Sequence, residues 1–226
     1  MQEIFDIYGY KLYISKDCRF GTDAVVLADF AAPKQNDDVV ELCAGCGAVS
    51  FFMLKKYAPK HIDAIDISAE AIALLSQSVA DNSLGGRITP IAADLRELNG
   101  VLPRERFDKV VVNPPYYKKN GGKVATARDR YARQELTCDI ADVANAASYL
   151  LKFGGTLKLC HTPERLAEVT AALQARGLEP KKLVFLMNGE SGKPWLFLMS
   201  AKRGAKPGLI VNVEQTPRLG GLFGDR

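Results

Sequence analysis

The sequence of 226 residues lacks an apolar run long enough to cross a membrane. Its longer apolar stretches are Ala24–Ala32, which Asp29 interrupts, and Leu183–Met187, and both fall short of the roughly 20 residues of a membrane span. The first residues contain Glu3 and Asp6 and no basic side chain before Lys11, which is unlike a secretory signal peptide. We therefore expect a cytoplasmic protein with no membrane partner.

Histidine is scarce and the number of cysteines is odd, which disfavours both a metal site and a disulfide framework. The two histidines, His61 and His161, do not lie near a pair of cysteines in the sequence. The five cysteines, which we expect to be reduced, are Cys18, Cys43, Cys46, Cys138 and Cys160. Cys43 and Cys46 have the spacing of redox and zinc motifs, but no second such pair exists, so small residues in a ligand loop are the favoured interpretation. The sequence predicts no metal.

The net charge of +4 is modest, but positive charge is concentrated in one segment. Residues 118–133, called the basic segment below, contain a single acid, Asp129. The basic residues of this segment are Lys118, Lys119, Lys123, Arg128, Arg130 and Arg133. Clustered positive charge suggests a polyanionic partner such as a nucleic acid. A solvated loop explains the charge alone equally well. The neighbouring residues must therefore decide between a solvated loop and a nucleic-acid site.

Apart from that segment, apolar runs of strand length alternate with helical patterns, which predicts an α/β domain. Strands are expected at residues 39–42, 62–66, 88–92, 109–112, 156–160, 182–187 and 195–201. Helices are expected at residues 48–57, 69–80, 139–152 and 163–176, with Ser68 as the cap of the second and Gly154-Gly155 ending the third. This order predicts a seven-stranded, mostly parallel sheet with helices on both faces, in which the last two strands form a hairpin and the last strand is antiparallel.

The pattern also suggests how the chain divides. Residues 1–32 are interpreted as an N-terminal cap, with a hairpin around Gly9 and a short helix at residues 24–30 that Thr22 or Asp23 caps. Residues 33–202 form the main domain. Residues 203–226 carry no recognised motif and are expected to form a C-terminal tail.

A glycine-rich turn and two acids follow the first three expected strands of the main domain. The turn, Glu41-Leu42-Cys43-Ala44-Gly45-Cys46-Gly47, lets the backbone approach a ligand closely. It lacks the third glycine of the dinucleotide fingerprint and the Lys-Ser/Thr ending of a P-loop, so NAD and ATP are disfavoured. Asp66 ends the next strand, where an acid can bind ribose hydroxyls, although it could instead cap a helix. Asp94 could hold an adenine amino group or be a turn residue.

The tetrad Asn113-Pro114-Pro115-Tyr116 follows the fourth strand, at the same edge of the sheet. The Asn113 oxygen and the Pro114 carbonyl can accept two hydrogen bonds, and neither proline offers an N–H. Tyr116 provides a ring on which a planar group can stack. Two acceptors and a ring suit a planar amine, so we interpret the tetrad as a catalytic site rather than a turn that merely ends the strand.

Together these residues resemble the class I S-adenosylmethionine-dependent methyltransferases that modify adenine N6 or glutamine N5. That resemblance implies a Rossmann-like fold and S-adenosyl-L-methionine as the cofactor. Phe20-Gly21-Thr22-Asp23-Ala24 before an apolar helix is similar to the bacterial family of tRNA(Val) adenine-N6 methyltransferases, which modify the adenine beside the anticodon.

The resemblance also implies a role for each of these residues. The cofactor-binding residues would be Thr22, Asp23, Glu41, Cys43, Gly45, Gly47, Asp66, Ile67, Asp94 and Leu95. Among them, Glu41 and the two glycines would surround the methionine part, Asp66 the ribose, and Asp94 with Leu95 the adenine. The catalytic residues would be Asn113, Pro114, Pro115 and Tyr116, and they would hold the target amine. Cys43 and Cys46 depart from the Gly, Thr or Ser that this superfamily often has there.

A tRNA partner is the expectation that follows, since the basic segment comes directly after the tetrad and can hold phosphates beside an extruded base. A protein glutamine methyltransferase and an rRNA guanine-N2 methyltransferase are the alternatives within the superfamily. A cofactor-binding RNA chaperone without turnover and an NAD-dependent oxidoreductase are alternatives from other classes. A monomer is expected by default.

Overall fold

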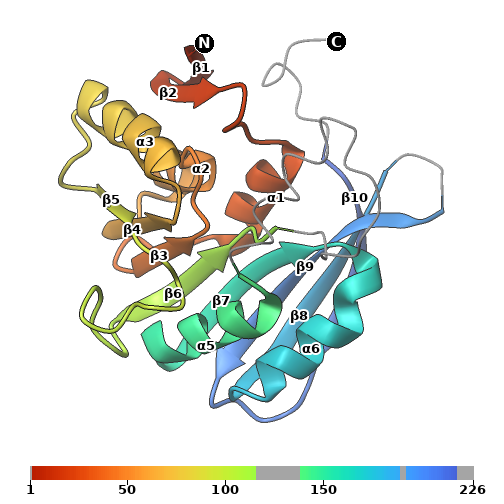
Figure 1. Cartoon of the computed structure of the whole chain (residues 1–226). Helices are drawn as coiled ribbons and strands as arrows, with labels where there is room; N and C mark the ends of the chain where they lie inside the picture. The colour runs from red at the N-terminus through yellow and green to blue at the C-terminus, as the bar shows by residue number, and fades with distance from the viewer. Residues whose placement is uncertain (1, 116–137, 189–191, 218–226) are drawn as a thin grey trace, which may run out of the picture.

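The structure is a computed structural model of the chain, and it describes residues 2–115, 138–188 and 192–217. Tyr116 and the basic segment therefore lie outside the described residues. Figure 1 shows a central sheet with helices on both faces and a small hairpin at the N-terminal end.

An eight-stranded sheet forms the centre, with the order β10-β8-β9-β7-β6-β3-β4-β5. The strands are β3 (Asp38–Leu42), β4 (His61–Asp66), β5 (Ile88–Ala92), β6 (Phe107–Val112), β7 (Leu151–His161), β8 (Leu178–Met187), β9 (Pro194–Arg203) and β10 (Ile210–Gln215). Among these strands, β9 alone is antiparallel to its neighbours β7 and β8, and every other pairing is parallel. The α/β fold class, the mostly parallel sheet and the final hairpin are confirmed.

Helices cover the sheet on both faces because each has one apolar side. On one face lie α1 (Thr22–Ala31), α2 (Ala48–Tyr57) and α3 (Ala69–Asp81), which share a buried core with the sheet. On the other face lie α5 (Ile140–Leu150) and α6 (Leu166–Gln174), which pack on a second core. Ser68 caps α3 as predicted, and its hydroxyl accepts a hydrogen bond from the Ala71 amide at 3.2 Å.

The N-terminal hairpin, β1 (Gln2–Ile7) and β2 (Tyr10–Ser15), packs on α3 rather than on the central sheet. Its turn contains Tyr8 and Gly9, both with positive φ, as predicted for a turn around Gly9. Buried side chains of the hairpin join the core of the α1 face, and the Tyr13 amide donates to Ser78 Oγ of α3 at 2.9 Å. The hairpin therefore closes one end of the molecule over α2 and α3.

Several expectations about individual elements are wrong. The sheet has eight strands rather than seven, because Ile210–Gln215, inside the range expected as a tail, pairs in parallel with β8 as β10. The antiparallel strand is thus not the last one. The helix α5 ends at Leu150 before Gly154, because β7 already begins at Leu151 beside β6. A short 3-10 turn, Pro163–Arg165, precedes α6, which was expected to begin at Pro163.

The cap of α1 also differs from the expectation. Gly21 is the N-cap residue and no side chain caps the helix, whereas Thr22 or Asp23 was expected to do so. The Asp23 carboxylate instead accepts a hydrogen bond from Asn113.

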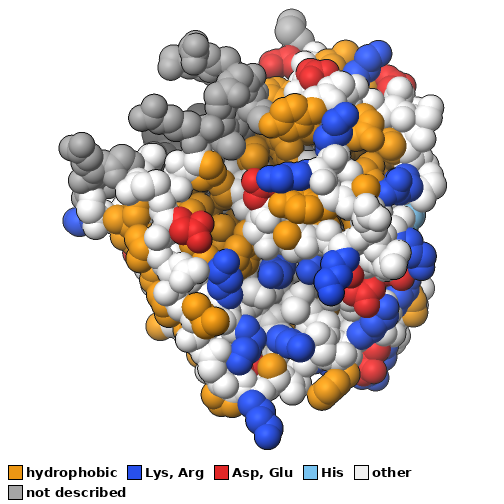
Figure 2. All heavy atoms as spheres, turned by 180° about the vertical axis from the view of Figure 1, so that it is seen from behind, with side chains coloured by type: hydrophobic (Ala, Val, Ile, Leu, Met, Phe, Trp, Pro, Cys, Tyr) orange, Lys and Arg blue, Asp and Glu red, His pale blue; other side chains and the backbone are white. Residues whose placement is uncertain are grey.

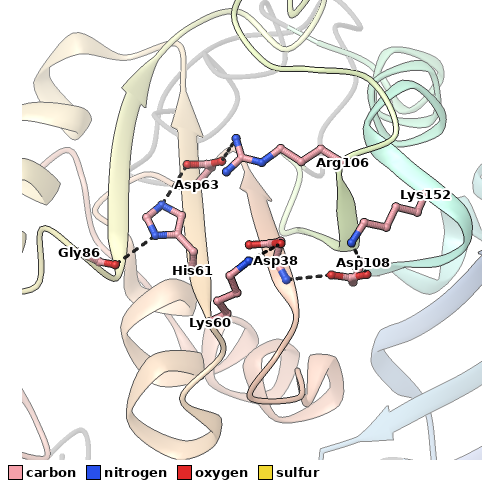
Figure 3. A network of polar contacts seen from close by, with 8 residues as sticks. All are labelled: Asp38, Lys60, His61, Asp63, Gly86, Arg106, Asp108 and Lys152. Carbon is pink, nitrogen blue, oxygen red and sulfur yellow. Dashed lines mark hydrogen bonds and ion pairs between the residues drawn. The ribbon is translucent and has the colours of Figure 1, made fainter.

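The two edges of the parallel sheet carry different kinds of residue. The glycine turn, the acids Asp66 and Asp94, and Asn113 follow the carboxyl ends of β3, β4, β5 and β6. Toward the amino ends, Figure 3 shows a network of polar contacts, in which Asp63 points toward Arg106 and the His61 ring. No helix among the described residues is long and apolar enough to cross a membrane.

Candidate active site

A cavity of about 390 Å³ lies where the carboxyl ends of β3, β4 and β6 meet the start of α1. Its lining includes most of the residues expected at the cofactor and catalytic sites. These are Asp23, Glu41, Cys43, Gly45, Asp66, Ile67, Asp94, Leu95, Asn113, Pro114 and Pro115. The structure therefore brings residues from 23 to 115 in the sequence to one place. Tyr116 and the six basic residues Lys118, Lys119, Lys123, Arg128, Arg130 and Arg133 lie outside the described residues.

The glycine turn is held against the end of β4 by the Asp66 carboxylate. One oxygen accepts a hydrogen bond from the Gly45 amide at 2.8 Å, and the other accepts one from the Ser68 amide at 2.8 Å. Burial raises the pKa of Asp66, while these backbone hydrogen bonds oppose the rise. Gly45 has φ of 54°, a left-handed conformation that glycine adopts without strain. Asp66 thus shapes the turn as well as lining the cavity.

Glu41 is almost completely buried beneath the same turn, with 2% of its surface exposed. Its carboxylate accepts a hydrogen bond from the Ser50 amide at 2.9 Å and another from the Ser50 hydroxyl. Burial raises the pKa of Glu41 to about 8, although the hydrogen bonds from Ser50 favour its charged form. A positive charge beside this buried carboxyl group would favour its charged form, so Glu41 is suited to face a cationic ligand.

Asp94 also lines the cavity, and its carboxylate is held by Arg96. The Arg96 Nε lies 3.0 Å from both carboxylate oxygens. The hydrogen bond from Arg96 lowers the pKa of Asp94, so this acid is charged at neutral pH. An ionised carboxylate only accepts hydrogen bonds, which fits a ligand that donates them.

Two of the expected cofactor residues, Thr22 and Gly47, are not among those that line the cavity. Gly47 has φ of 85° and precedes α2, and a Cβ atom there would clash with the side chain of Leu75. Gly47 therefore lets the turn before α2 lie close to Leu75 of α3. Thr22 begins α1 beside Asp23.

Both ends of the Asn113 side-chain amide are engaged at the edge of the cavity. Its nitrogen donates to Asp23 Oδ2 at 2.9 Å, and its oxygen accepts from the Cys160 thiol at 3.1 Å. The nitrogen end of the amide is thus the end that faces Asp23. The contact with Cys160 places the oxygen at the other end. The orientation of Asn113 is therefore set by residues from α1 and β7.

Four of the cysteines lie around the cavity in two pairs. Cys18 is the thiol neighbour of Cys46, and Cys138 is the thiol neighbour of Cys43. The neighbouring thiol and burial raise the pKa of Cys43 and of Cys46. Both thiols are consequently protonated at neutral pH. Among the described residues, no group of three or more His, Cys, Asp or Glu could hold a metal ion.

The cavity includes residues that sequence reasoning did not assign to a site. The loop before α1 contributes Asp17, Cys18 and Arg19, and Cys138 comes from the residues before α5. The Phe20-Gly21 that follows this loop was part of the resemblance, and it is the one signal that could have led there. Cys160 carries no motif, because its contact with Asn113 depends on the pairing of β7 with β6.

Comparison with known proteins points to one family. A family model described as "Methyltransferase small domain" matches residues 15–160. Three similar curated proteins bear the name tRNA1(Val) (adenine(37)-N6)-methyltransferase. The protein from Dyadobacter fermentans is 23% identical over 80% of this chain, the one from Porphyromonas gingivalis 27% over 67%, and the one from Flavobacterium johnsoniae 26% over 73%. This chain spans 74%, 61% and 70% of their respective lengths.

Solved structures with the same fold are also methyltransferases by name. A predicted O-methyltransferase from Agrobacterium tumefaciens superposes with a TM-score of 0.69 at 21% identity, over 85% of this chain and 86% of its own. The tRNA m1G37 methyltransferase of M. jannaschii gives 0.63 at 20% identity, over 91% of this chain and 57% of its own. At such identities these matches establish the fold alone.

Proposed function

Because this chain belongs to the methyltransferase small domain family, we propose that it transfers a methyl group from S-adenosylmethionine to the N6 amine of an adenine in tRNA, beside the anticodon. The observation that carries the proposal is the Asn113 amide, which Asp23 and Cys160 hold in a fixed orientation at the cavity. The names of the three curated relatives support adenine N6 and tRNA as the target.

The cavity fits the cofactor in size and in the chemistry of its walls. Its volume of about 390 Å³ lies within the roughly 300–1,000 Å³ of small-molecule sites. S-adenosylmethionine carries positive charge on its sulfur and its amino group, and Glu41, Asp66 and Asp94 line the walls. When bound, the cofactor supplies an electrophilic methyl group.

Each wall of the cavity would hold one part of the cofactor. Glu41 and the Gly45 turn, with Cys43 beside them, would surround the methionine part. Asp66 and Ile67 at the end of β4 would bind the ribose. Asp94 would accept from the adenine amino group, and Leu95 would pack on the ring.

The target amine would be held by two acceptors. A carbonyl oxygen has two lone pairs, so the Asn113 oxygen can accept from the substrate while it also accepts from the Cys160 thiol. The Pro114 carbonyl would accept the second N–H, and Pro115 has no N–H that could compete for it. Holding both N–H bonds turns the nitrogen lone pair toward the methyl group. No histidine is among the described residues that line the cavity, which is consistent with a proton that leaves after attack.

Stacking of the base on Tyr116 and phosphate binding by the basic segment remain parts of this proposal. An adenine must leave its stack to reach the cavity, which costs a few kcal/mol and less in an RNA loop. Lys118, Lys119, Lys123, Arg128, Arg130 and Arg133 follow the tetrad directly in the sequence and would hold phosphates there. A single chain supplies every residue of the proposed site, so a monomer is sufficient.

The test is to incubate the protein with labelled S-adenosylmethionine and total RNA from a strain that lacks the gene, and to identify the labelled nucleoside. N6-methyladenosine in the tRNA fraction is the expected product. Label in N2-methylguanosine would overturn the adenine assignment, and label in a protein band would favour glutamine. No label in any fraction would contradict a methyltransferase acting on these substrates.

Asn113→Ala is the variant that tests the residue carrying the proposal. It removes the acceptor of the target amine, so turnover should fall by a factor of roughly 10² or more. Cofactor affinity, measured by calorimetry, should stay close to that of the unchanged protein. An equal loss of both would assign Asn113 to the cofactor instead of the base.

A further inference from the structure

A second cluster of lysines, separate from the basic segment, lies on the α1 face of the central sheet. The Lys158 Nζ of β7 lies 4.7 Å from the centre of the Phe30 ring, and the Lys182 Nζ of β8 lies 5.6 Å from the same ring. In the sheet, both residues are paired with Ser200 of β9, so the three side chains lie on one face at one level. Two ammonium groups from strands that are not neighbours thus converge on one aromatic side chain.

A third lysine increases the positive charge around Lys158. Lys109 of β6 is directed at the same region, and its Nζ lies 3.8 Å from Asp37 Oδ2 and 3.5 Å from Thr156 Oγ1. The charged groups that act on Lys158 are Lys109 from β6 and Lys182 from β8, while β9 contributes Ser200 and α1 contributes Phe30. Both charges repel that of Lys158.

The energetics of this arrangement are unfavourable without a ligand. Lys158 is half-buried, and burial together with the two neighbouring cations lowers its pKa to about 8. A lysine stem that merely packs on an aromatic ring keeps its ammonium group in water, away from other cations. Figure 2, which views the molecule from the face opposite to α5 and α6, shows Lys and Arg side chains gathered across the middle of this face. An anion would relieve both the burial and the repulsion.

The cluster lies close to the candidate active site on the same side of the sheet. Cys160, which contacts Asn113, follows Lys158 by two residues on β7, a separation of about 7 Å along a strand. The helix α1 likewise connects Asp23, which lines the cavity, to Phe30, which contacts Lys158 and Lys182. These two residues are seven positions apart, which is about 10 Å along a helix. A strand of RNA whose base enters the cavity can therefore reach the lysines.

We propose that Lys158 and Lys182, arranged around Phe30 with Lys109 behind them, form a phosphate site that binds the RNA backbone outside the active-site cavity. The identification of this partner as RNA rests on the proposed function. A phosphate group carries the negative charge that would balance these lysines, and the phosphates of a nucleic-acid backbone bind Lys side chains without reference to base sequence. The site would orient the RNA, whereas the cavity selects the base.

The experiment measures the affinity of the full chain for bulk tRNA at several salt concentrations, without cofactor, so that no turnover occurs. Lys158→Met and Lys182→Met keep an unbranched stem on Phe30 and remove the charge. Each should weaken binding by about 3- to 10-fold and reduce the slope of log affinity against log salt by about one. Lys60→Met is the matched control, because its exposed ammonium pairs with Asp38 at the amino edge of the sheet (Figure 3). It should leave the slope unchanged.

Two further measurements separate this role from simple packing. Removing mutual repulsion should leave the variants at least as stable as the original protein in urea unfolding, even though they bind RNA more weakly. In the unmodified protein, affinity should decline as the pH rises through about 8, where Lys158 loses its charge, and Lys158→Met should lack this decline. The decline itself is measured on the unmodified protein, so this part of the test does not depend on the folding of a variant.

Each outcome decides the matter. Unchanged affinity and salt slope in both variants, with a pH response equal to that of the original protein, would overturn the site. Competition by inorganic phosphate at concentrations that leave tRNA binding to Lys158→Met unaffected would support it. Because binding is measured without methyl transfer, a failure to form N6-methyladenosine would contradict the proposed function and leave this result standing.

Discussion

The Asp23 carboxylate accepts a hydrogen bond from the Asn113 amide at 2.9 Å, and this contact joins the first turn of α1 to the end of β6. Asp23→Ala should leave the amide free to rotate, so turnover should fall by a factor of roughly 10 to 100. Asp23→Asn retains a carbonyl acceptor and should recover part of that loss. Turnover and cofactor affinity, measured separately for each variant, test this role of Asp23 as a positioning residue.

The matched control for Asp23 is Asp17→Ala, which removes another carboxylate from the same cavity. Asp17→Ala should change cofactor affinity and turnover by similar factors, because the hydrogen bonds described for Asn113 are with Asp23 and Cys160. Asp23 would be a cofactor ligand alone if its alanine variant lost cofactor affinity and turnover equally and Asp23→Asn brought no recovery.

The buried Glu41 carboxyl makes the stability of the fold depend on pH. Its pKa in the folded protein is about 8, above the ordinary value of 4.5, so between these values the folded state holds a proton that the unfolded state releases. The free energy of unfolding should therefore be highest near the ordinary pKa and fall as the pH rises toward 8. Urea unfolding should show a loss of at least about 2 kcal/mol from about pH 5 to about pH 8, which Glu41→Gln removes. Equal pH profiles for both proteins would contradict it.

At the scale of the elements, the close approach of the turn before α2 to Leu75 of α3 depends on the absence of a side chain at Gly47. Gly47→Ala adds a Cβ that clashes with Leu75 and meets a φ of 85°. Gly100→Ala is the control, because Gly100 has the same φ of 85° and nothing lies within 4 Å of an added Cβ. The strain of φ should cost both variants about 1 kcal/mol, and the clash should cost Gly47→Ala about 1–3 kcal/mol more in urea unfolding. Equal losses would remove the packing role.

Elements whose signals are local were predicted well from the sequence. The bounds of α2 and of β5 match their predicted ranges, and Ser68 caps α3, because apolar periodicity and a cap residue act within one segment. β10 was missed because its residues are paired on one side only, and Ile210, Val211 and Val213 remain exposed. Only the pairing with β8 makes this segment a strand.

The candidate site shows the same division between local and long-range information. The glycine turn, Asp66, Asp94 and Asn113 could be found because each follows an apolar strand, and strands of a parallel sheet end at a common edge. The partners of Asn113 could not be found this way. Cys160 is brought to it by the alignment of β7 with β6, and Asp23 by the packing of α1, and neither contact leaves a pattern in the sequence.

In the molecule as a whole, the two edges of the parallel sheet have separate roles. The carboxyl edge gathers the cavity and its buried acids. The amino edge carries polar contacts between charged or ionisable side chains, among them Asp63 with His61 of the same strand, β4, at 3.3 Å and with Arg106, which precedes β6, at 3.4 Å (Figure 3). Residues at opposite ends of the strands do not touch, so their substitutions should act independently on stability and on ligand binding.

Asp63→Ala tests that separation. The Asp63 side chain is only 5% exposed, whereas its partner Arg106 is 39% exposed and can be rehydrated. Losing the contact should therefore lower the free energy of unfolding by only about 1 kcal/mol, because no buried charge is left unpaired and the buried Asp63 Oδ2 makes no hydrogen bond among the described residues. Lys60→Met breaks a pair in which the lysine is 64% exposed and should cost less than about 1 kcal/mol. Both variants should bind cofactor as tightly as the original protein at temperatures where they are folded. Weaker cofactor binding in folded Asp63→Ala would show that the two edges are coupled through β4, whose last residue, Asp66, holds the glycine turn.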